Sequence, residues 1–477
     1  MKDLSKFKWE SVIERDFVLG LGQVQTASNF RDLKIHPRRS IMTLSVRQSR
    51  GPTGPQNAEA SNYPGRREGG RTSKAGRTRS MERSAKMIER AELLKIFYEL
   101  YGTSARLFRA PGRVNLIGEH TDYNDGFVLP MAINHDVVVA AAARNDTLVR
   151  VHSINLGESL EFDLSLPGPP RRGIWLDYVE GVAQMLLRKG VPVGGANLII
   201  QSDVPVGSGL SSSAALEVAV GYALWSVSGG NVDILELALA GQQAEHVYVG
   251  ARVGIMDQLT SAAGRAGHAL LIDCRSLEID HIPLDTSATD ILICDSRVKH
   301  EIASSAYNKR REECEESVRL LRQALPYIRA LRDVSVSEFQ EHQNLLTGDV
   351  KKRARHVVTE NERTLKAAEA LRRNDFEEMG RLMSASHRSL RDDFEVSSFE
   401  LDLLVEIASG IDGVYGARMT GGGFGGCTVN LVRHEAVEPL KQAIIDGYEK
   451  ETGKTPLIYI TPATDGVSEI KLGSMAI

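Results

Sequence analysis

The feature that most restricts the fold of this chain is a glycine- and serine-rich loop between an apolar strand and an apolar helix. Residues 196–204 have the pattern of a buried strand, and residues 214–227 form an apolar run of helical length. The loop lies in VPVGSGLSSSAAL, residues 204–216. Glycines let a backbone approach an anion closely, and the free N–H groups at a helix start favour phosphate. The pattern therefore predicts a strand–loop–helix unit with a phosphate site at its turn.

A plainer interpretation of this loop stays open at this stage. It could be a turn in which Ser211 or Ser212 caps the helix. It is not a Walker A motif, because no lysine follows its glycines. The sequence GYEKETGKT at 447–455 has one residue too many before its Gly-Lys pair, and Gly453 is better explained as a helix stop.

A second cluster of polar residues lies in GRVNLIGEHTDY, residues 112–123. Four charged or titratable side chains fall within ten residues of an otherwise apolar stretch: Arg113, Glu119, His120 and Asp122. Clustered donors and acceptors of this kind suit a hydroxyl-rich ligand. The alternative is a surface turn with solvated charges.

Two further segments have residues that are typical of a ligand-binding or catalytic site. TGGGFGG, residues 420–426, places five glycines between two expected strands, which indicates close backbone approach to a ligand or to another loop. A flexible hairpin is the alternative. Asp257, in GIMDQ at 254–258, is a lone carboxylate among apolar residues. By itself it could equally be a helix cap or a hydrogen-bonded core residue.

The remaining pattern predicts an α+β protein with a strand-rich first half and a helix-rich second half. Residues 136–144 and 147–154 are expected to pair as strands through an Asn145-Asp146 turn. The other expected elements are helices at 89–101 (ending at Gly102), 175–189, 234–249 and 436–451, a mostly helical region at 303–409, and strands at 291–294, 414–418, 427–432 and 457–460.

Length and composition exclude several classes of protein. The chain has 477 residues with 42% hydrophobic and 25% charged residues, which is ordinary for a globular protein of two or three domains. The net charge of −4 gives no reason to expect a nucleic-acid partner. No apolar run reaches the length of a transmembrane helix, and no signal peptide is evident. Four cysteines without metal-site spacing predict reduced, mostly buried thiols in a cytoplasmic protein.

The first eighty or so residues differ from the rest. Residues 47–86 are rich in arginine, glycine, serine and proline, and Tyr63 is their only aromatic residue. Such a segment cannot bury enough apolar surface to offset its ordering entropy. We expect residues 1–82 to be a disordered basic extension, or to result from translation upstream of a start at Met81, rather than to be a nucleic-acid arm or a targeting peptide.

Taken together, these segments resemble the GHMP kinases and, within that superfamily, the galactokinases. GRVNLIGEHTDY resembles the galactokinase signature, VPVGSGLSSSAAL the phosphate-loop motif, and RMTGGGFGGC from Arg418 the third motif. GIMDQ and the segment SSAYNKRREECEE at 304–316 are also similar to galactokinase segments. The five matches stand in the family's order and extend from about residue 83 to the C-terminus.

The resemblance implies a role for each matched position. Asp257 would be the base that takes the proton of the sugar's C1 hydroxyl, and Arg113 would lie between that hydroxyl and the transferred phosphoryl group. The implied sugar contacts are Glu119, His120, Thr121, Asp122 and Tyr307. The implied nucleotide contacts are Gly207, Ser208, Gly209, Leu210, Ser211, Ser212 and Ser213. Ser213 and Glu245 would hold Mg²⁺.

The implied activity is ATP-dependent phosphorylation of galactose to galactose 1-phosphate, and the implied fold has two domains. An N-terminal α+β domain (83–295) and a ferredoxin-like C-terminal domain (296–477) would enclose the active site between them. We expect a monomer with galactose and ATP as substrates and without nucleic-acid or membrane partners. A kinase for a related sugar, such as N-acetylgalactosamine or galacturonate, stays open. A non-catalytic galactose sensor is less consistent with the intact serine run of the phosphate loop.

Overall fold

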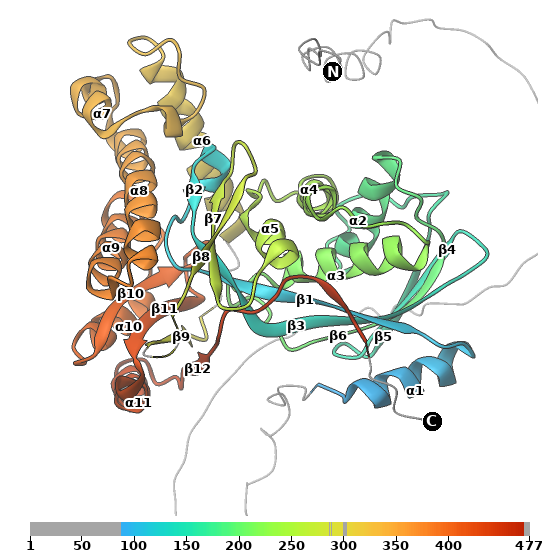
Figure 1. The fold of residues 1–477 in the computed structure, drawn as a ribbon. Helices are drawn as coiled ribbons and strands as arrows, with labels where there is room; N and C mark the ends of the chain where they lie inside the picture. Colours follow the sequence, from blue (N-terminus) through green and yellow to red (C-terminus); the bar gives the residue numbers. More distant parts are fainter. Residues whose placement is uncertain (1–86, 286, 288, 299–302, 472–477) are drawn as a thin grey trace, which may run out of the picture. The chain divides into compact units, whose positions relative to one another are not determined.

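The computed structural model describes residues 87–285, 287, 289–298 and 303–471, and these fall in one compact unit spanning 79–477. The expected basic extension, residues 1–82, lies outside the described residues. Helices and strands are mixed, which confirms the α+β prediction (Figure 1). All four cysteines are buried and unpaired. None of the helices in the described ranges is long and apolar enough to cross a membrane.

A six-stranded sheet organises the first half of the fold, in the order β13-β1-β3-β6-β4-β5. The strands are β1 (Arg106–Asn115), β3 (Pro130–Ala143), β4 (Leu148–Ser153), β5 (Glu158–Asp163), β6 (Ala196–Ser202) and β13 (Ser468–Ile470). Helices cover both faces of its centre (Figure 1). Leu107 and Val138 face α1 (Arg90–Tyr101), whereas the next residues, Phe108 and Val139, belong to the larger core on the opposite face.

The predicted pairing of residues 136–144 with 147–154 is wrong. Both segments are strands, but β6 lies between β3 and β4, antiparallel to the first and parallel to the second. Because β6 is buried along nearly its whole length, it belongs in the interior of the sheet. Apolar alternation places a strand's side chains on a face of the sheet but does not choose the neighbouring strand.

Four helices cover one face of this sheet, as Figure 1 shows. They are α2 (Leu176–Arg188), α3 (Ser212–Val227), α4 (Ile234–Ala244) and α5 (Met256–Ala263). A π-helical turn, Glu245–Val249, continues α4. The predicted helices at 89–101, 175–189, 214–227 and 234–249 are confirmed, and α1 ends at Gly102 with φ of 67°. A smaller sheet, not predicted, contains β2 (Phe127–Val128), β7 (His268–Asp273) and β8 (Ile279–Pro283).

The second half contains an antiparallel four-stranded sheet, β10-β11-β9-β12. Its strands are β9 (Thr289–Asp295), β10 (Val414–Thr420), β11 (Cys427–Arg433) and β12 (Leu457–Ile460). The helices are α6 (Ala303–Leu321), α7 (Val336–His342), α8 (Gly348–Arg372), α9 (Phe376–Ser389), α10 (Phe399–Ser409) and α11 (Val437–Thr452). Short turns occupy Asp122–Asn124, Leu331–Asp333, Gln343–Leu345, Leu390–Phe394 and His434–Ala436.

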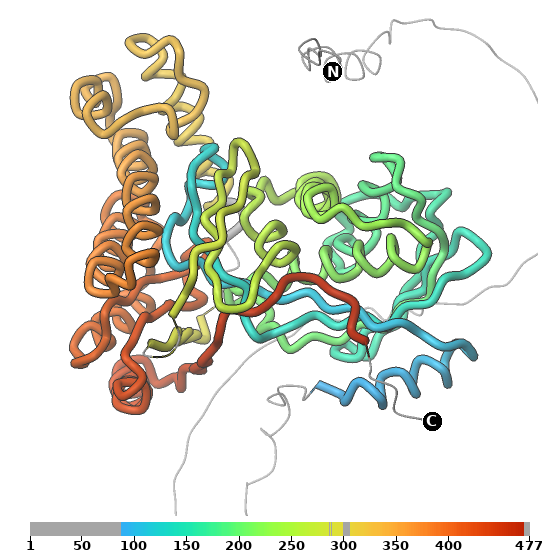
Figure 2. The backbone as a smooth tube through the Cα atoms, viewed as in Figure 1, coloured from blue at the N-terminus to red at the C-terminus, as the bar shows by residue number. Residues whose placement is uncertain are grey.

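The chain crosses between the two large sheets more than once. Strand β9 precedes residue 296 but pairs with β11 and β12, and the final strand, β13, returns to pair with β1. Figure 2 shows this return, with the red C-terminal segment running beside the blue strand β1. The division of the chain at residues 295 and 296 stays a prediction.

Candidate active site

One cavity of about 90 Å³ gathers most of the predicted site residues. The segment after β1, the start of α5, helix α6 and the glycine loop after β10 all contribute to its wall. The lining residues are Arg113, Glu119, His120, Asp122, Val253, Gly254, Met256, Asp257, Tyr307, Gly421 and Gly422. Segments that are distant in the sequence therefore meet around a single space.

Arg113 and Asp257 form a two-pronged ion pair at this cavity. Nε and Nη2 of Arg113 donate to the two carboxylate oxygens of Asp257 at 2.8 and 2.7 Å. Arg113 stands just after an irregularity in β1, and Asp257 lies in the first turn of α5. Only 4% of Arg113 is exposed. This bidentate pair, with its guanidinium buried and its carboxylate partly exposed, fixes both side chains, because the planar guanidinium matches the carboxylate in geometry.

The same pair is joined to the predicted phosphate loop. Ser211 Oγ donates to Asp257 Oδ2, and Arg113 Nη1 donates to the carbonyl oxygen of Gly209 at 2.7 Å. The loop also approaches β1 closely, since a Cβ atom on Gly112 would lie 2.7 Å from the Leu210 carbonyl oxygen. Asp257 is therefore shared between the cavity and the loop.

The loop has the backbone of an anion site. Gly207 and Gly209 have φ of 73° and 83°, and Ser211 is left-handed with φ of 60°. Ser211 occupies the N-cap position of α3, but no side chain caps the helix. The alternative of a serine-capped turn is therefore wrong, because the Ser211 hydroxyl binds Asp257. The positive end of a sixteen-residue helix remains available to an anion.

The third glycine segment packs against this loop. A Cβ atom on Gly421 would lie 2.9 Å from the Gly209 carbonyl oxygen, and one on Gly426 would lie 2.8 Å from that of Ser208. Both glycines have positive φ. The predicted close approach to another loop is present, and it depends on the absence of side chains here.

The sugar-binding segment, defined here as residues 118–127, contains the predicted sugar contacts Glu119 to Asp122 and presents three of its side chains to the cavity. Glu119 is fixed by donors: the Gly421 N–H at 2.7 Å and the Asn115 side-chain amide at 2.8 Å. The backbone at His120 is left-handed, with φ of 62°. Thr121 is fully buried, does not line the cavity, and has its hydroxyl beside the Gly118 and Phe127 carbonyl oxygens. Thr121 therefore supports the backbone of the segment and does not reach the cavity.

Burial shifts the pKa values of Asp122 and His120 in opposite directions. Burial, followed by the charge of Asp257, raises the pKa of Asp122 to about 7. Gly254 is needed beside it, because a Cβ atom there would lie 1.8 Å from Asp122 Oδ2. Burial lowers the pKa of His120 well below its usual value, so the ring is neutral at pH 7. His120 Nδ1 lies 2.9 Å from the Tyr123 hydroxyl, and its buried Nε2 has no hydrogen-bond partner among the described residues.

Tyr307 completes the aromatic side of the cavity. Its ring centroid lies 5.4 Å from that of His120 and 5.3 Å from that of Tyr123. Burial raises the pKa of Tyr307 well above its usual value, so its hydroxyl keeps its proton. A flat apolar surface beside a phenol donor suits one face of a sugar.

The predicted Mg²⁺ ligands lie side by side. Ser213 Oγ donates to Glu245 Oε1 over 2.9 Å, from the first turn of α3 to the π-helical turn after α4. Burial raises the pKa of Glu245 to about 7, and a bound cation would oppose this shift. Within the described ranges there is no cluster of three or more His, Cys, Asp or Glu side chains that could enclose a metal. Two oxygen donors fit Mg²⁺, which keeps waters and takes further oxygens from phosphates.

The sequence interpretation missed several residues that support the site. Arg418 is fully buried, and its Nη1 donates to the Asn115 carbonyl oxygen at 3.0 Å and lies 3.4 Å from Glu119. Gln258 Nε2 donates to Glu217 at 3.0 Å, next to Glu245. Arg418 and Gln258 stand inside matched motifs, which is the signal that could have found them.

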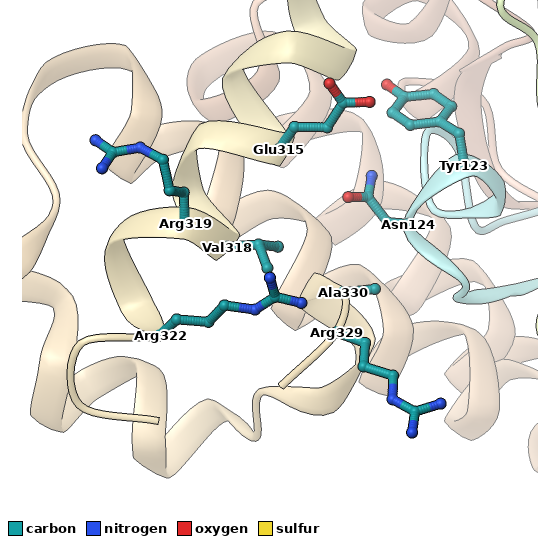
Figure 3. Close-up of a pocket in the computed structure, with 8 residues that line it drawn as sticks. All are labelled: Tyr123, Asn124, Glu315, Val318, Arg319, Arg322, Arg329 and Ala330. Atoms are coloured by element: carbon teal, nitrogen blue, oxygen red, sulfur yellow. The ribbon is translucent and has the colours of Figure 1, made fainter. Parts of the chain in front are cut away.

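Tyr123 also lines a second cavity, of about 220 Å³ (Figure 3). The other lining residues are Asn124, Glu315, Val318, Arg319, Arg322, Arg329 and Ala330. In Figure 3 the Arg319 and Arg329 side chains point away from one another. Arg319 is paired with Glu316, and Arg322 donates to the Ile328 carbonyl oxygen. This cavity contains none of the predicted site residues.

Comparison with known proteins agrees with the motif order. The chain matches the galactokinase galactose-binding signature over residues 95–143, the GHMP kinase N-terminal domain over 177–265 and the GHMP kinase C-terminal domain over 367–450. It is 52% identical to the galactokinase of Chloroflexus aurantiacus over 383 residues, covering 80% of this chain and 98% of that protein. A galactokinase of Actinobacillus pleuropneumoniae (serotype 5b) is 47% identical over 379 residues, covering 78% of this chain and 97% of that protein.

Solved structures give the same result. The galactokinase of Lactococcus lactis, crystallised with galactose, superposes with a TM-score of 0.77 at 37% identity and covers 80% of this chain and 99% of that one. The mevalonate kinase of Methanococcus jannaschii, at a TM-score of 0.55 and 20% identity, shares the fold and covers 76% of this chain and 99% of its own. On this evidence, the chain belongs to the galactokinase family of the GHMP kinases.

Proposed function

We propose that this chain transfers the terminal phosphoryl group of ATP to the C1 hydroxyl of α-D-galactose. The product is galactose 1-phosphate, an intermediate of galactose catabolism by the Leloir pathway. Family membership supports a sugar kinase that uses ATP, and the galactose-binding signature covers the segment that lines the cavity.

The observation that carries this proposal is the position of Asp257. Its carboxylate lines the cavity, accepts the Ser211 hydroxyl of the phosphate loop, and is held by Arg113. A base that serves a sugar hydroxyl and a phosphoryl donor must lie where the two half-sites meet. Phosphoryl transfer depends on such positioning more than on covalent chemistry by the protein.

In the proposed reaction, the C1 hydroxyl oxygen attacks the terminal phosphorus of ATP. A C1–O–P bond forms while the bond to the bridging oxygen breaks, and ADP leaves. Asp257 accepts the hydroxyl proton, and Arg113 offsets the negative charge that develops between sugar and phosphate. Because two nitrogens of Arg113 hold both Asp257 oxygens, the carboxylate is oriented before the sugar binds.

The phosphate loop, from Gly207 to Ser213, would hold the phosphates of ATP through its backbone N–H groups. Ser213 and Glu245 would hold Mg²⁺, which neutralises phosphate charge when bound. On the sugar side, Asp122 would accept hydrogen bonds from galactose hydroxyls, including the axial C4 hydroxyl. Glu119, His120 and Tyr307 would make the other polar contacts.

A coupled assay for ADP release tests this function with galactose, N-acetylgalactosamine and no sugar. We expect the rate of ADP release to be higher with galactose than with N-acetylgalactosamine or without sugar. Turnover with N-acetylgalactosamine alone would identify the related-sugar kinase, and galactose binding without turnover would identify a sensor.

The role of Asp257 has its own test. Asp257→Asn keeps the shape but removes the proton acceptor, so kcat should fall about 100-fold or more while ATP binding persists. Asp412→Asn, at an exposed position, is the matched control. Normal turnover by the Asp257 variant would reject its role as the base.

A further inference from the structure

Helix α8 carries a row of polar side chains that are buried and lie outside the cavity. His356, Glu360 and Thr364 are fully buried and are spaced four residues apart, so they share one face of the helix. Asn361 is 7% exposed and stands beside them. None of the four lines the cavity. Buried polar groups in a helix need partners, and His356, Glu360 and Asn361 each have one on the backbone of the sugar-binding segment.

Glu360 binds the backbone at the start of that segment. Its Oε1 accepts the Gly118 N–H at 3.0 Å, and its Oε2 accepts Arg363 Nε at 2.7 Å. Burial acts to raise the pKa of Glu360, but Arg363, together with the other nearby positive groups and the Ser386 hydroxyl, lowers the pKa to about 2. The side chain is therefore a permanent acceptor for Gly118.

His356 binds the next peptide group. Its Nε2 lies 3.1 Å from the Glu119 carbonyl oxygen and its Nδ1 lies 2.9 Å from Ser389 Oγ. A carbonyl oxygen only accepts, so Nε2 carries the proton, and Nδ1 lies beside the Ser389 hydroxyl, which is also 3.2 Å from Asp393 Oδ2. Burial lowers the pKa of His356 to about 4, so this neutral form holds at pH 7.

Asn361 binds the far end of the segment. Its Oδ1 accepts the Phe127 N–H at 2.9 Å. The helix and the segment are also in direct contact: a Cβ atom on Gly126 would lie 2.3 Å from Asn361 Oδ1, and one on Gly118 would lie 2.9 Å from Thr364 Oγ1. Three backbone groups, on both sides of His120 and Asp122, are thus held by one helix.

The conformation of the segment explains why it needs this support. His120 has a left-handed backbone, with φ of 62°, which is unfavourable for a residue with a Cβ atom. Such a conformation persists only where surrounding contacts enforce it. The Glu119 carbonyl that His356 holds belongs to the peptide group immediately before His120.

We propose that α8 fixes the geometry of the sugar site, with His356, Glu360 and Asn361 acting as positioning residues for Glu119, His120 and Asp122. They act on the affinity for the sugar and leave phosphoryl transfer and ATP binding unchanged. This inference rests on the proposed function, because it assigns the cavity to the sugar.

Steady-state kinetics of the full chain, with each substrate varied in turn, test the inference. His356→Ala removes the donor to Glu119, so the KM for galactose should rise about tenfold. The kcat at saturating galactose and the KM for ATP should stay within about twofold. His356→Gln, which offers an N–H donor of similar reach, should recover most of the loss. Asn361→Ala should likewise raise the KM for galactose while kcat and the KM for ATP stay nearly unchanged. It provides a second test if His356→Ala does not fold.

Glu362→Gln is the matched control, since Glu362 is exposed on the same helix and is paired with Lys366. It should leave all three constants unchanged. An unchanged KM for galactose in both the His356 and Asn361 variants would overturn the inference. So would a parallel loss of kcat, ATP affinity and melting temperature, which is the signature of a purely structural role. A wild-type chain without galactose-dependent turnover would instead overturn the proposed function, and this inference with it.

Discussion

The raised pKa of Asp122 predicts that galactose binding depends on pH near neutrality. Burial and the charge of Asp257 raise this pKa to about 7. Only the ionised carboxylate accepts hydrogen bonds through both oxygens, so protonation should weaken binding as the pH falls through 7. His120 does not contribute a titration in this range, because its pKa lies well below its usual value.

The magnitude follows from the titration of one group. With a pKa of about 7, roughly nine-tenths of Asp122 is ionised at pH 8 and about one-tenth at pH 6. If binding requires the ionised form, the dissociation constant for galactose should be about tenfold higher at pH 6 than at pH 8. This factor corresponds to about 1.4 kcal/mol of binding free energy.

Calorimetric titration with galactose alone measures the dissociation constant directly at each pH. Because ATP and Mg²⁺ are absent, metal binding does not contribute to the measured affinity. Asp122→Asn should bind galactose weakly and with little pH dependence. Asp125→Asn, on the same segment, should keep the wild-type dependence, since asparagine tolerates the left-handed backbone found there. Equal affinity of the wild type at pH 6 and pH 8, or a tenfold change that persists in Asp122→Asn, would refute the reasoning.

Three further substitutions have defined outcomes. Glu245→Gln should raise the Mg²⁺ concentration for half-maximal activity several-fold, because it removes an anionic ligand; a Mg²⁺ titration of the coupled assay measures it. Gly254→Ala should raise the KM for galactose at least tenfold, because its Cβ atom would displace Asp122. Gly380→Ala should destabilise the fold by about 1–3 kcal/mol in denaturant unfolding, because its Cβ atom would lie 1.9 Å from the Tyr415 carbonyl oxygen.

Matched controls are available in the chain. Glu236→Gln changes an exposed carboxylate on α4 and should leave the Mg²⁺ titration unchanged. Gly410→Ala meets its nearest neighbour only at 3.4 Å and should leave galactose kinetics and stability almost unchanged. An unaltered Mg²⁺ titration in Glu245→Gln would assign that residue a structural role, and a normal galactose KM in Gly254→Ala would show that Asp122 has room to move.

Features that depend on neighbouring residues in the chain could be predicted from the sequence alone. The end of α1 at Gly102 could be predicted locally, because the residue after the helix adopts a left-handed backbone and glycine does so without strain. The strand, glycine loop and apolar helix around residues 204–216 could also be predicted from neighbouring residues. Glycine accounts for the positive φ values in the loop, and the apolar composition of α3 accounts for its burial. Motif order then indicated the family, which the comparisons confirmed.

Tertiary structure alone decided which of these local elements meet. The insertion of β6 between β3 and β4 was beyond the sequence pattern, since alternation specifies a face and not a neighbour. The hydroxyl of Ser211 fits a helix cap in sequence, yet it binds Asp257, 46 residues away. His356 and Glu119 are 237 residues apart, and nothing in the spacing of either reveals the other. Such contacts form because buried polar groups must find partners, and which partner is within reach is a property of the packed fold.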